Sequence, residues 1–187
     1  LQEGINEVPA SRSMKRALAS SDSGIIAEFK RRSPSKGWSK QEARPEEIVP
    51  SYLAAGASAL SILTDEKFFG GSLKDIRTAR PLVDVPIIRK DFIIDEYQLY
   101  QAKIVGADAV LLIAAALKQE KCQELAEQAH ELGLEVLLEI HSAEELPYIN
   151  SKIDMIGINN RNLGTFFTDV ENSFRLAGQL PQDAVLV

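Results

Sequence analysis

Charged and polar side chains recur where apolar stretches of this chain end, and their types suit acid–base chemistry on an anionic molecule. Two carboxylates and two lysines can donate and accept protons, and burial beside opposite charges tunes the pKa values of such groups toward neutrality. A guanidinium adds a planar fork that can hold a substrate carboxylate. The residues in these positions are Glu28, Lys30, Lys90, Glu139, Asn159 and Arg161.

The first cluster leads into a loop with the composition of an anion site. Glu28 and Lys30 are two residues apart, so they share one face of a strand while Phe29 takes the other. The loop that follows holds Ser33 and Lys36, which supply a hydroxyl, a cation and backbone amides for a phosphate. This stretch alone fits a solvated salt bridge equally well, but similar groups at five strand ends or in the loops beside them favour a ligand site.

Apolar and uncommon residues add further candidates. Phe69, Phe92 and Leu111 offer an apolar wall for a ring, with core or loop packing as the alternative for each. His141 is two residues after Glu139, so the two would point to the same strand face, but His141 lies past the end of the strand. This favours a capping or supporting role for His141. Cys122 lies on the apolar stripe of a predicted helix, so burial is expected rather than catalysis.

The composition narrows the classes of protein that this chain fits. With 187 residues and 45% hydrophobic content, one domain with a sizeable core is expected. No run approaches the ~20 apolar residues of a membrane span. A net charge of -6 without a long basic run argues against a nucleic-acid partner. One cysteine rules out an internal disulfide framework, and two distant histidines argue against a metal site. We expect a cytoplasmic protein that binds a small anionic molecule.

Apolar runs alternate with helical patterns along the chain, as in parallel α/β proteins. Strands are predicted over 24–27, 59–63, 86–90, 109–113, 135–139 and 154–159, with a seventh beginning at 184–187. Helices are predicted around 13–18, over 118–132 and over 169–176, and one more runs from Pro45 to Gly56. Another begins with a capping box of Asp95 with Gln98 and ends at Gly106. Two further helices begin at caps, one of Ser72 with Asp75 and one of Ser142 with Glu145.

This order of elements predicts a parallel sheet, either doubly wound or closed into a barrel. No glycine-rich nucleotide-binding motif follows the first strand. A complete (β/α)8 barrel takes about 250 residues. Six βα units and the start of a seventh strand therefore fit an incomplete (β/α)8 TIM barrel. We expect 1–23 to be an N-terminal segment against the barrel and 24–187 to be the barrel domain.

Four ordered motifs resemble the indole-3-glycerol phosphate synthase family. They are Ile26-Ala27-Glu28-Phe29-Lys30-Arg31-Arg32-Ser33-Pro34-Ser35, Arg89-Lys90-Asp91-Phe92-Ile93, Leu138-Glu139-Ile140-His141 and Gly157-Ile158-Asn159-Asn160-Arg161-Asn162-Leu163. The similarity runs from about residue 13 onward. It implies a (β/α)8 barrel of tryptophan biosynthesis. The implied substrate, 1-(2-carboxyphenylamino)-1-deoxyribulose 5-phosphate, is cyclised, decarboxylated and dehydrated without a cofactor or a metal.

The resemblance also implies roles for individual residues. Lys90 matches the general acid that protonates the ketone oxygen, and Glu139 matches a carboxylate that assists proton transfer around ring closure and dehydration. Glu28 and Lys30 match the catalytic pair on the first strand, with Lys30 near the phosphate. Which group serves the dehydration step stays open. The residues matched to substrate binding are Asn159, Arg161, Ser33, Phe69, Phe92 and Leu111.

The sequence departs from the family pattern at its carboxyl end. The family's seventh strand ends in a glutamate-serine-glycine segment and its eighth in a glycine-rich phosphate loop, and this sequence stops before both. Barrel phosphate sites depend on the loops after strands seven and eight. We therefore expect little or no activity from residues 1–187 alone. We also expect self-association through exposed strand edges.

Two other interpretations remain open. A Schiff-base aldolase on a related barrel would use Lys90 or Lys30 as its nucleophile. A catalytically inactive barrel fragment would instead serve as a folding or association module. Phosphoribosylanthranilate isomerase, a neighbouring barrel of the same pathway, fits worse, because its cysteine and aspartate pair has no convincing counterpart at these strand ends.

Overall fold

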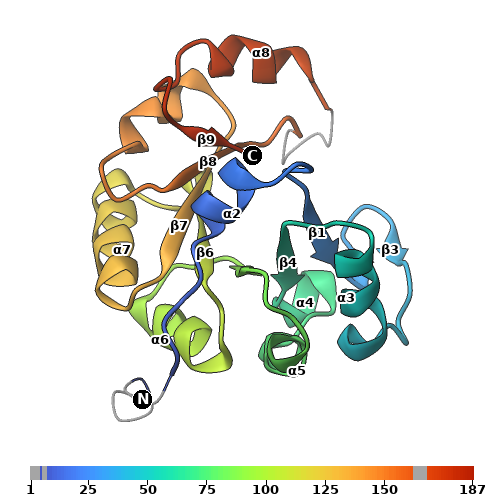
Figure 1. Cartoon of the computed structure of the whole chain (residues 1–187). Coiled ribbons are helices and arrows are strands. Elements are labelled where there is room, and N and C mark those ends of the chain that lie inside the picture. The colour runs from blue at the N-terminus through green and yellow to red at the C-terminus, as the bar shows by residue number, and fades with distance from the viewer. Residues whose placement is uncertain (1–4, 6–7, 162–167) are drawn as a thin grey trace.

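A curved sheet of seven parallel strands forms the centre of the molecule (Figure 1). The computed structural model describes residue 5 and residues 8–161 and 168–187. The order of the strands in the sheet is their order in the chain, as in a barrel. Within the described residues β1 and β9 are the two edges, so the predicted incomplete barrel is confirmed. The strands are β1 (Ile26–Phe29), β4 (Ala59–Leu63), β5 (Ile87–Lys90), β6 (Ala109–Ile113), β7 (Glu135–Ile140), β8 (Met155–Ile158) and β9 (Val185–Leu186).

Helices connect successive strands and cover the outer face of the sheet (Figure 1). The α-helices after β1 are α3 (Pro45–Ala54), α4 (Glu66–Phe69), α5 (Leu73–Ala79), α6 (Glu96–Val105), α7 (Gln119–Glu131) and α8 (Glu171–Ala177). Three 3-10 helices join them, η1 (Arg80–Leu82), η2 (Ala114–Ala116) and η3 (Ala143–Tyr148). A small antiparallel hairpin of β2 (Arg32–Ser33) and β3 (Gly37–Trp38) follows β1.

Local sequence signals set several of these boundaries as predicted. The Asp95 side chain accepts from the backbone of α6 while Gln98 reaches back to the cap, so the predicted capping box is present. The helix ends at Gly106, whose φ of 92° suits glycine alone among common residues. Pro45 begins α3, where its missing N–H costs nothing.

Two of the predicted caps need correction. Ser72 caps α5 by accepting from Lys74, but the Asp75 carboxylate binds Arg31 instead of supporting the cap. The segment after Ser142 is the 3-10 helix η3, and the Ser142 side chain makes no capping hydrogen bond there. A proline inside η3 explains the difference, because it cannot donate the hydrogen bond that an α-helix requires at that position.

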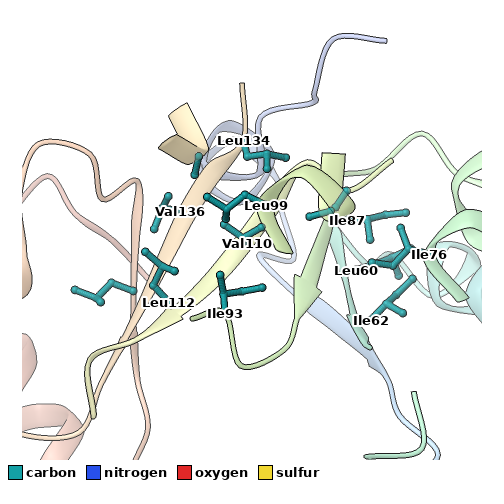
Figure 2. Packing of buried hydrophobic residues seen from close by; sticks show 14 of the residues in the cluster. Leu60, Ile62, Ile76, Ile87, Ile93, Leu99, Val110, Leu112, Leu134 and Val136 are labelled. Carbon is teal, nitrogen blue, oxygen red and sulfur yellow. The ribbon is translucent and has the colours of Figure 1, made fainter. Parts of the chain in front are cut away.

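Side chains alternate between two apolar layers along the strands. Outward residues such as Leu60, Ile87, Val110 and Val136 pack against the helices in the larger cluster, part of which is drawn in Figure 2. Inward residues make a second, smaller cluster consisting of Met14, Ala59, Ile88, Ala109, Leu111, Ile113, Leu137 and Met155. The alternation sends the next inward residues toward the carboxyl ends of the strands, where the candidate site lies.

Helix α2 (Met14–Ser20) packs against the amino ends of the strands. Its Met14 side chain is fully buried in the inner cluster. Asp108, which is 2% exposed, ties this end together. Its carboxylate accepts from the Arg12 amide at 2.7 Å, from the Arg80 guanidinium at 2.6 Å and from the Ile87 amide at 2.9 Å. The amino ends of the strands therefore have a structural role, and the candidate site lies at the opposite end of the sheet.

Candidate active site

One cavity of about 260 Å³ lies at the carboxyl ends of the strands, and all ten residues predicted for the site line it. Because the strands are parallel, their carboxyl ends meet at one mouth even though the residues span positions 28 to 161. The ten residues are Glu28, Lys30, Ser33, Phe69, Lys90, Phe92, Leu111, Glu139, Asn159 and Arg161. The structure thus brings the predicted set together, while the chemical role of each residue stays a prediction.

Glu28 bridges the two lysines of the cavity. Its Oε2 accepts from Lys90 Nζ at 2.6 Å, and its Oε1 accepts from Lys30 Nζ at 2.7 Å. Burial acts to raise the pKa of Glu28, but the charge of Lys90 and the hydrogen bonds from both lysines outweigh it and hold that pKa below its ordinary value. Glu28 is therefore ionised at neutral pH, with one ammonium on each carboxylate oxygen.

A buried network on the outer face of β5 fixes the strand end that carries Lys90. The neighbouring Arg89 points to the other face and is 4% exposed. Its guanidinium donates to Thr64 Oγ1 at 3.0 Å, to the Gln98 carbonyl at 2.7 Å and to Asp91 Oδ2 at 2.9 Å. Burial lowers the pKa of Arg89 from its usual value, with Asp91 acting against that. Asp91 also lines the cavity, but these structural bonds occupy its carboxylate.

Glu139 and Asn159 form a second polar group across the cavity, at the ends of β7 and β8. The Asn159 amide donates to Glu139 Oε1 at 3.1 Å. Asn159 Oδ1 accepts from the backbone N–H of Arg161 at 2.9 Å, which turns the chain after β8. Arg161 also bridges to Thr168 in an isolated antiparallel contact. Asn162 and Leu163, the last residues of the fourth motif, lie outside the described residues.

The loop after β1 supplies the groups suited to a phosphate. Ser33 and Ser35 line the cavity beside Lys30. Arg31 anchors this loop because its guanidinium binds both oxygens of Asp75, at 2.6 and 2.9 Å, and the Ala43 carbonyl at 2.8 Å. The hydrogen bond to Asp75 raises the pKa of Arg31 above its usual value. The anchor lets the lysine before it and the serines after it face the cavity.

Apolar side chains form the remaining wall. The rings of Phe69 and Phe92 lie with their centroids 6.3 Å apart, and Leu111 lies on β6. Leu63 and Ile113 also line the cavity and were missed by the sequence prediction. Strand alternation could have found Ile113, because it is two residues after Leu111 on the same strand and so points to the same face. Leu63 could have been found as the last residue of β4, at the carboxyl end where the site lies.

Cys122 behaves as predicted, since it is fully buried on α7 and burial raises the pKa of its thiol to about 11. Among the residues that the structure describes, no group of three or more His, Cys, Asp and Glu side chains could hold a metal ion. In the same part of the chain, the helices are too short or too polar to cross a membrane.

A parallel sheet that gathers paired acids and amines at its carboxyl end defines a protein of the (β/α) barrel class with a candidate active site at that end. The family model for indole-3-glycerol phosphate synthase matches residues 1–187. The chain therefore belongs to the indole-3-glycerol phosphate synthase family.

Several curated relatives carry the name indole-3-glycerol phosphate synthase. The protein of Rhodopirellula baltica is 48% identical over 97% of this chain and 71% of the relative. The protein of Burkholderia multivorans is 46% identical over 90% of this chain and 65% of the relative. The protein of Neisseria meningitidis is 50% identical over 87% of this chain and 63% of the relative. The chain thus spans about two thirds of the length of these relatives.

Two solved structures share the fold at low sequence identity. The 3-keto-L-gulonate-6-phosphate decarboxylase of Vibrio cholerae gives a TM-score of 0.58 at 14% identity, over 81% of this chain and 70% of that chain. The ribulose-1,5-bisphosphate carboxylase/oxygenase of Pyrococcus horikoshii gives 0.56 at 14% identity, over 94% of this chain and 48% of that chain. These likenesses concern the fold alone.

Proposed function

We propose that the protein catalyses indole-3-glycerol phosphate synthesis, as a carbon–carbon lyase of the carboxy-lyase class. The substrate would be 1-(2-carboxyphenylamino)-1-deoxyribulose 5-phosphate. The observation that carries this proposal is the arrangement of Glu28, Lys90 and Glu139 around one cavity that also holds Lys30 and an apolar wall. The family and its relatives support this reading over that of an inactive association module.

Lys90 is the proposed general acid. Ring closure requires the aromatic carbon to attack the ketone, and protonation of the ketone oxygen stabilises the charge that develops there. Glu28 holds the Lys90 ammonium at 2.6 Å, which orients it while leaving its other N–H bonds for the substrate. The second proton-transfer group is Glu139 on the opposite side of the cavity. Loss of carbon dioxide then restores conjugation and needs mainly correct positioning.

The remaining residues of the set bind the substrate in this proposal. Lys30, Ser33 and the loop amides take the phosphate, which also fits a local positive cluster in a chain of net charge -6. Arg161 and Asn159 take the polar groups of the substrate, and Phe69 and Phe92 stack beside its ring. The partner is thus a phosphorylated small molecule and not a nucleic acid. We place the reaction in the cytoplasm.

The test is a fluorescence assay for indole-3-glycerol phosphate, with the intact mass of the same sample measured alongside. Lys90→Ala should abolish product formation, because it removes the acid. Lys118→Ala, at an exposed position outside the cavity, is the matched control and should retain wild-type activity. Where the wild-type sample forms product, equal loss in both variants, or unchanged turnover in Lys90→Ala, would contradict the assignment.

A measurement of substrate binding distinguishes a protein that has the site but does not catalyse the reaction from a protein that lacks the site. We expect residues 1–187 alone to turn over little substrate, so product at family-like rates from a sample of that mass would refute this expectation. Isothermal titration calorimetry with the substrate measures binding whether or not product forms. A sample that forms no product and shows no saturable heat of binding on adding substrate would refute the proposed function.

A Schiff-base aldolase is the second candidate, and one observation speaks against it. An amine nucleophile must lose its proton, whereas both lysines donate to the ionised Glu28. Borohydride reduction with a ketose phosphate, followed by mass spectrometry, tests this candidate. A covalent adduct on Lys90 or Lys30 would establish it, and no adduct would remove it.

A further inference from the structure

His141 lies beside Glu139 in an unusual setting for a histidine. It follows β7 by one residue, and its side chain is 16% exposed. Its Nε2 lies 3.6 Å from Glu139 Oε1, and its Nδ1 lies 3.8 Å from Glu145 Oε2. Within the described part of the chain, both ring nitrogens are buried and neither makes a hydrogen bond. A buried polar group without a partner is costly, so this arrangement calls for a physical reason.

The backbone around His141 is held from two further elements. Its N–H donates to Glu145 Oε2 on η3 at 2.6 Å. Its carbonyl accepts from the Asn172 side chain on α8 at 2.8 Å. The ring is therefore kept between the carboxylates of Glu139 and Glu145 by contacts that do not involve the ring itself. These two acids are the titratable groups that face its nitrogens.

Both neighbours of Glu139 approach the same carboxylate oxygen. Asn159 donates to Oε1 at 3.1 Å, and His141 Nε2 also points to Oε1. Oε2 is thereby the oxygen that remains for a ligand in the cavity. A short movement of the ring would convert the 3.6 Å approach into a hydrogen bond, and such contacts tighten in many enzymes only when a ligand is bound.

We propose that His141 is a positioning residue for Glu139. Its Nε2–H and the Asn159 amide together fix Oε1, so that Oε2 is presented to the substrate in one orientation. This rests on the proposed function for the part played by Glu139, but the contact between the two side chains is a property of the chain itself. The competing explanation is that the imidazole only fills space between β7 and η3.

Nitrogen NMR of the imidazole rings tests the contact without any need for activity. The chain holds two histidines, and the other, His130, pairs with Asp154 at 2.9 Å and does not line this cavity. Glu139→Gln should shift the Nε2 signal of His141 and leave both signals of His130 in place. Glu145→Gln should instead shift the Nδ1 signal. Unchanged His141 signals in a Glu139→Gln variant whose His130 signals are native would overturn the proposal.

Two substitutions of His141 then separate positioning from space filling. A glutamine amide reaches about as far as Nε2, whereas an asparagine amide reaches only as far as Nδ1. In a form of the protein that turns over substrate, His141→Asn should lower kcat by about tenfold with little change in KM, because tenfold corresponds to about 1.4 kcal/mol, the scale of one hydrogen bond. His141→Gln should recover most of kcat. Equal losses in the two variants would indicate space filling and overturn the proposal.

The two lines of evidence also separate this inference from the function on which it rests. A protein that neither forms the product nor binds the substrate would refute the proposed function. The NMR result would still decide whether His141 holds Glu139.

Discussion

Replacing Glu28 by glutamine removes the negative charge that joins the two lysines of the cavity while keeping the shape of the side chain. The three side chains are 27–39% exposed, so each ion pair is worth about 0.5–1 kcal/mol rather than the larger value of a buried pair. The Glu28→Gln variant should therefore lose about 1–2 kcal/mol of unfolding free energy at pH 7. With a urea m-value of about 2 kcal/mol per molar, the midpoint falls by about 0.5–1 M.

The same variant carries a signature in pH. Glu28 has a folded-state pKa below its ordinary value of 4.5, because the lysines favour its charged form against the effect of burial. Its contribution to stability is fully present above the unfolded-state pKa and is lost as pH falls through the lower folded-state pKa. Protonated Glu28 resembles glutamine, so the gap between wild type and variant should close in acid.

Urea unfolding at neutral pH and at about pH 3 measures both effects. Glu42→Gln, at an exposed position in the loop before α3, is the matched control and should change the neutral midpoint by no more than about 0.25 M, which is the scatter of surface substitutions. A Glu28→Gln midpoint equal to wild type at pH 7 would show that the bridge does not stabilise the fold. A gap that persists undiminished in acid would show that the loss has a cause other than the charge.

Three further expectations concern the rest of the molecule. Asp108→Asn should cost about 3 kcal/mol in urea unfolding, because it leaves the Arg80 guanidinium without its buried carboxylate, whereas Asp84→Asn at the surface should leave the midpoint unchanged within the scatter of surface substitutions. Cys122, with a thiol pKa of about 11, should resist a disulfide reagent at pH 8 until urea unfolds the chain; rapid modification of the native protein would contradict its burial. Residues 1–187 alone should self-associate through β1 and β9, and a monomer at every concentration in sedimentation would refute this.

The strands could be predicted closely because their buried faces leave a plain signal. β4 and β6 have the predicted bounds, since every residue in them is buried and the runs are apolar apart from Ser61. The capping box of α6 could be predicted because both of its residues act within one turn. These features depend on neighbours in the chain, which a sequence displays directly.

The features that could not be predicted depend on partners far along the chain. Asp75 looked like part of a cap, but it is bound by Arg31 from 44 positions away. The bridge of Glu28 to Lys90 joins residues 62 positions apart. It spans the strand β4, which lies between β1 and β5 in the sheet. The alternation of side chains along each strand could place both side chains inside the barrel. It could not show that one carboxylate would serve two lysines.

The two carboxylates of the cavity end up in different electrostatic settings, and this bears on how they divide the chemistry. Glu28 has an ammonium on each oxygen and a lowered pKa, which makes it a weak base suited to holding lysines in place. Glu139 lies on β7, where its Oε1 accepts a hydrogen bond from the neutral amide of Asn159 and lies 3.6 Å from Nε2 of the His141 imidazole. Acid and base roles in one active site follow from such differences in environment. In the proposed mechanism, this difference suits Glu139 to take up a proton during the reaction while Glu28 holds Lys90 in place to give one.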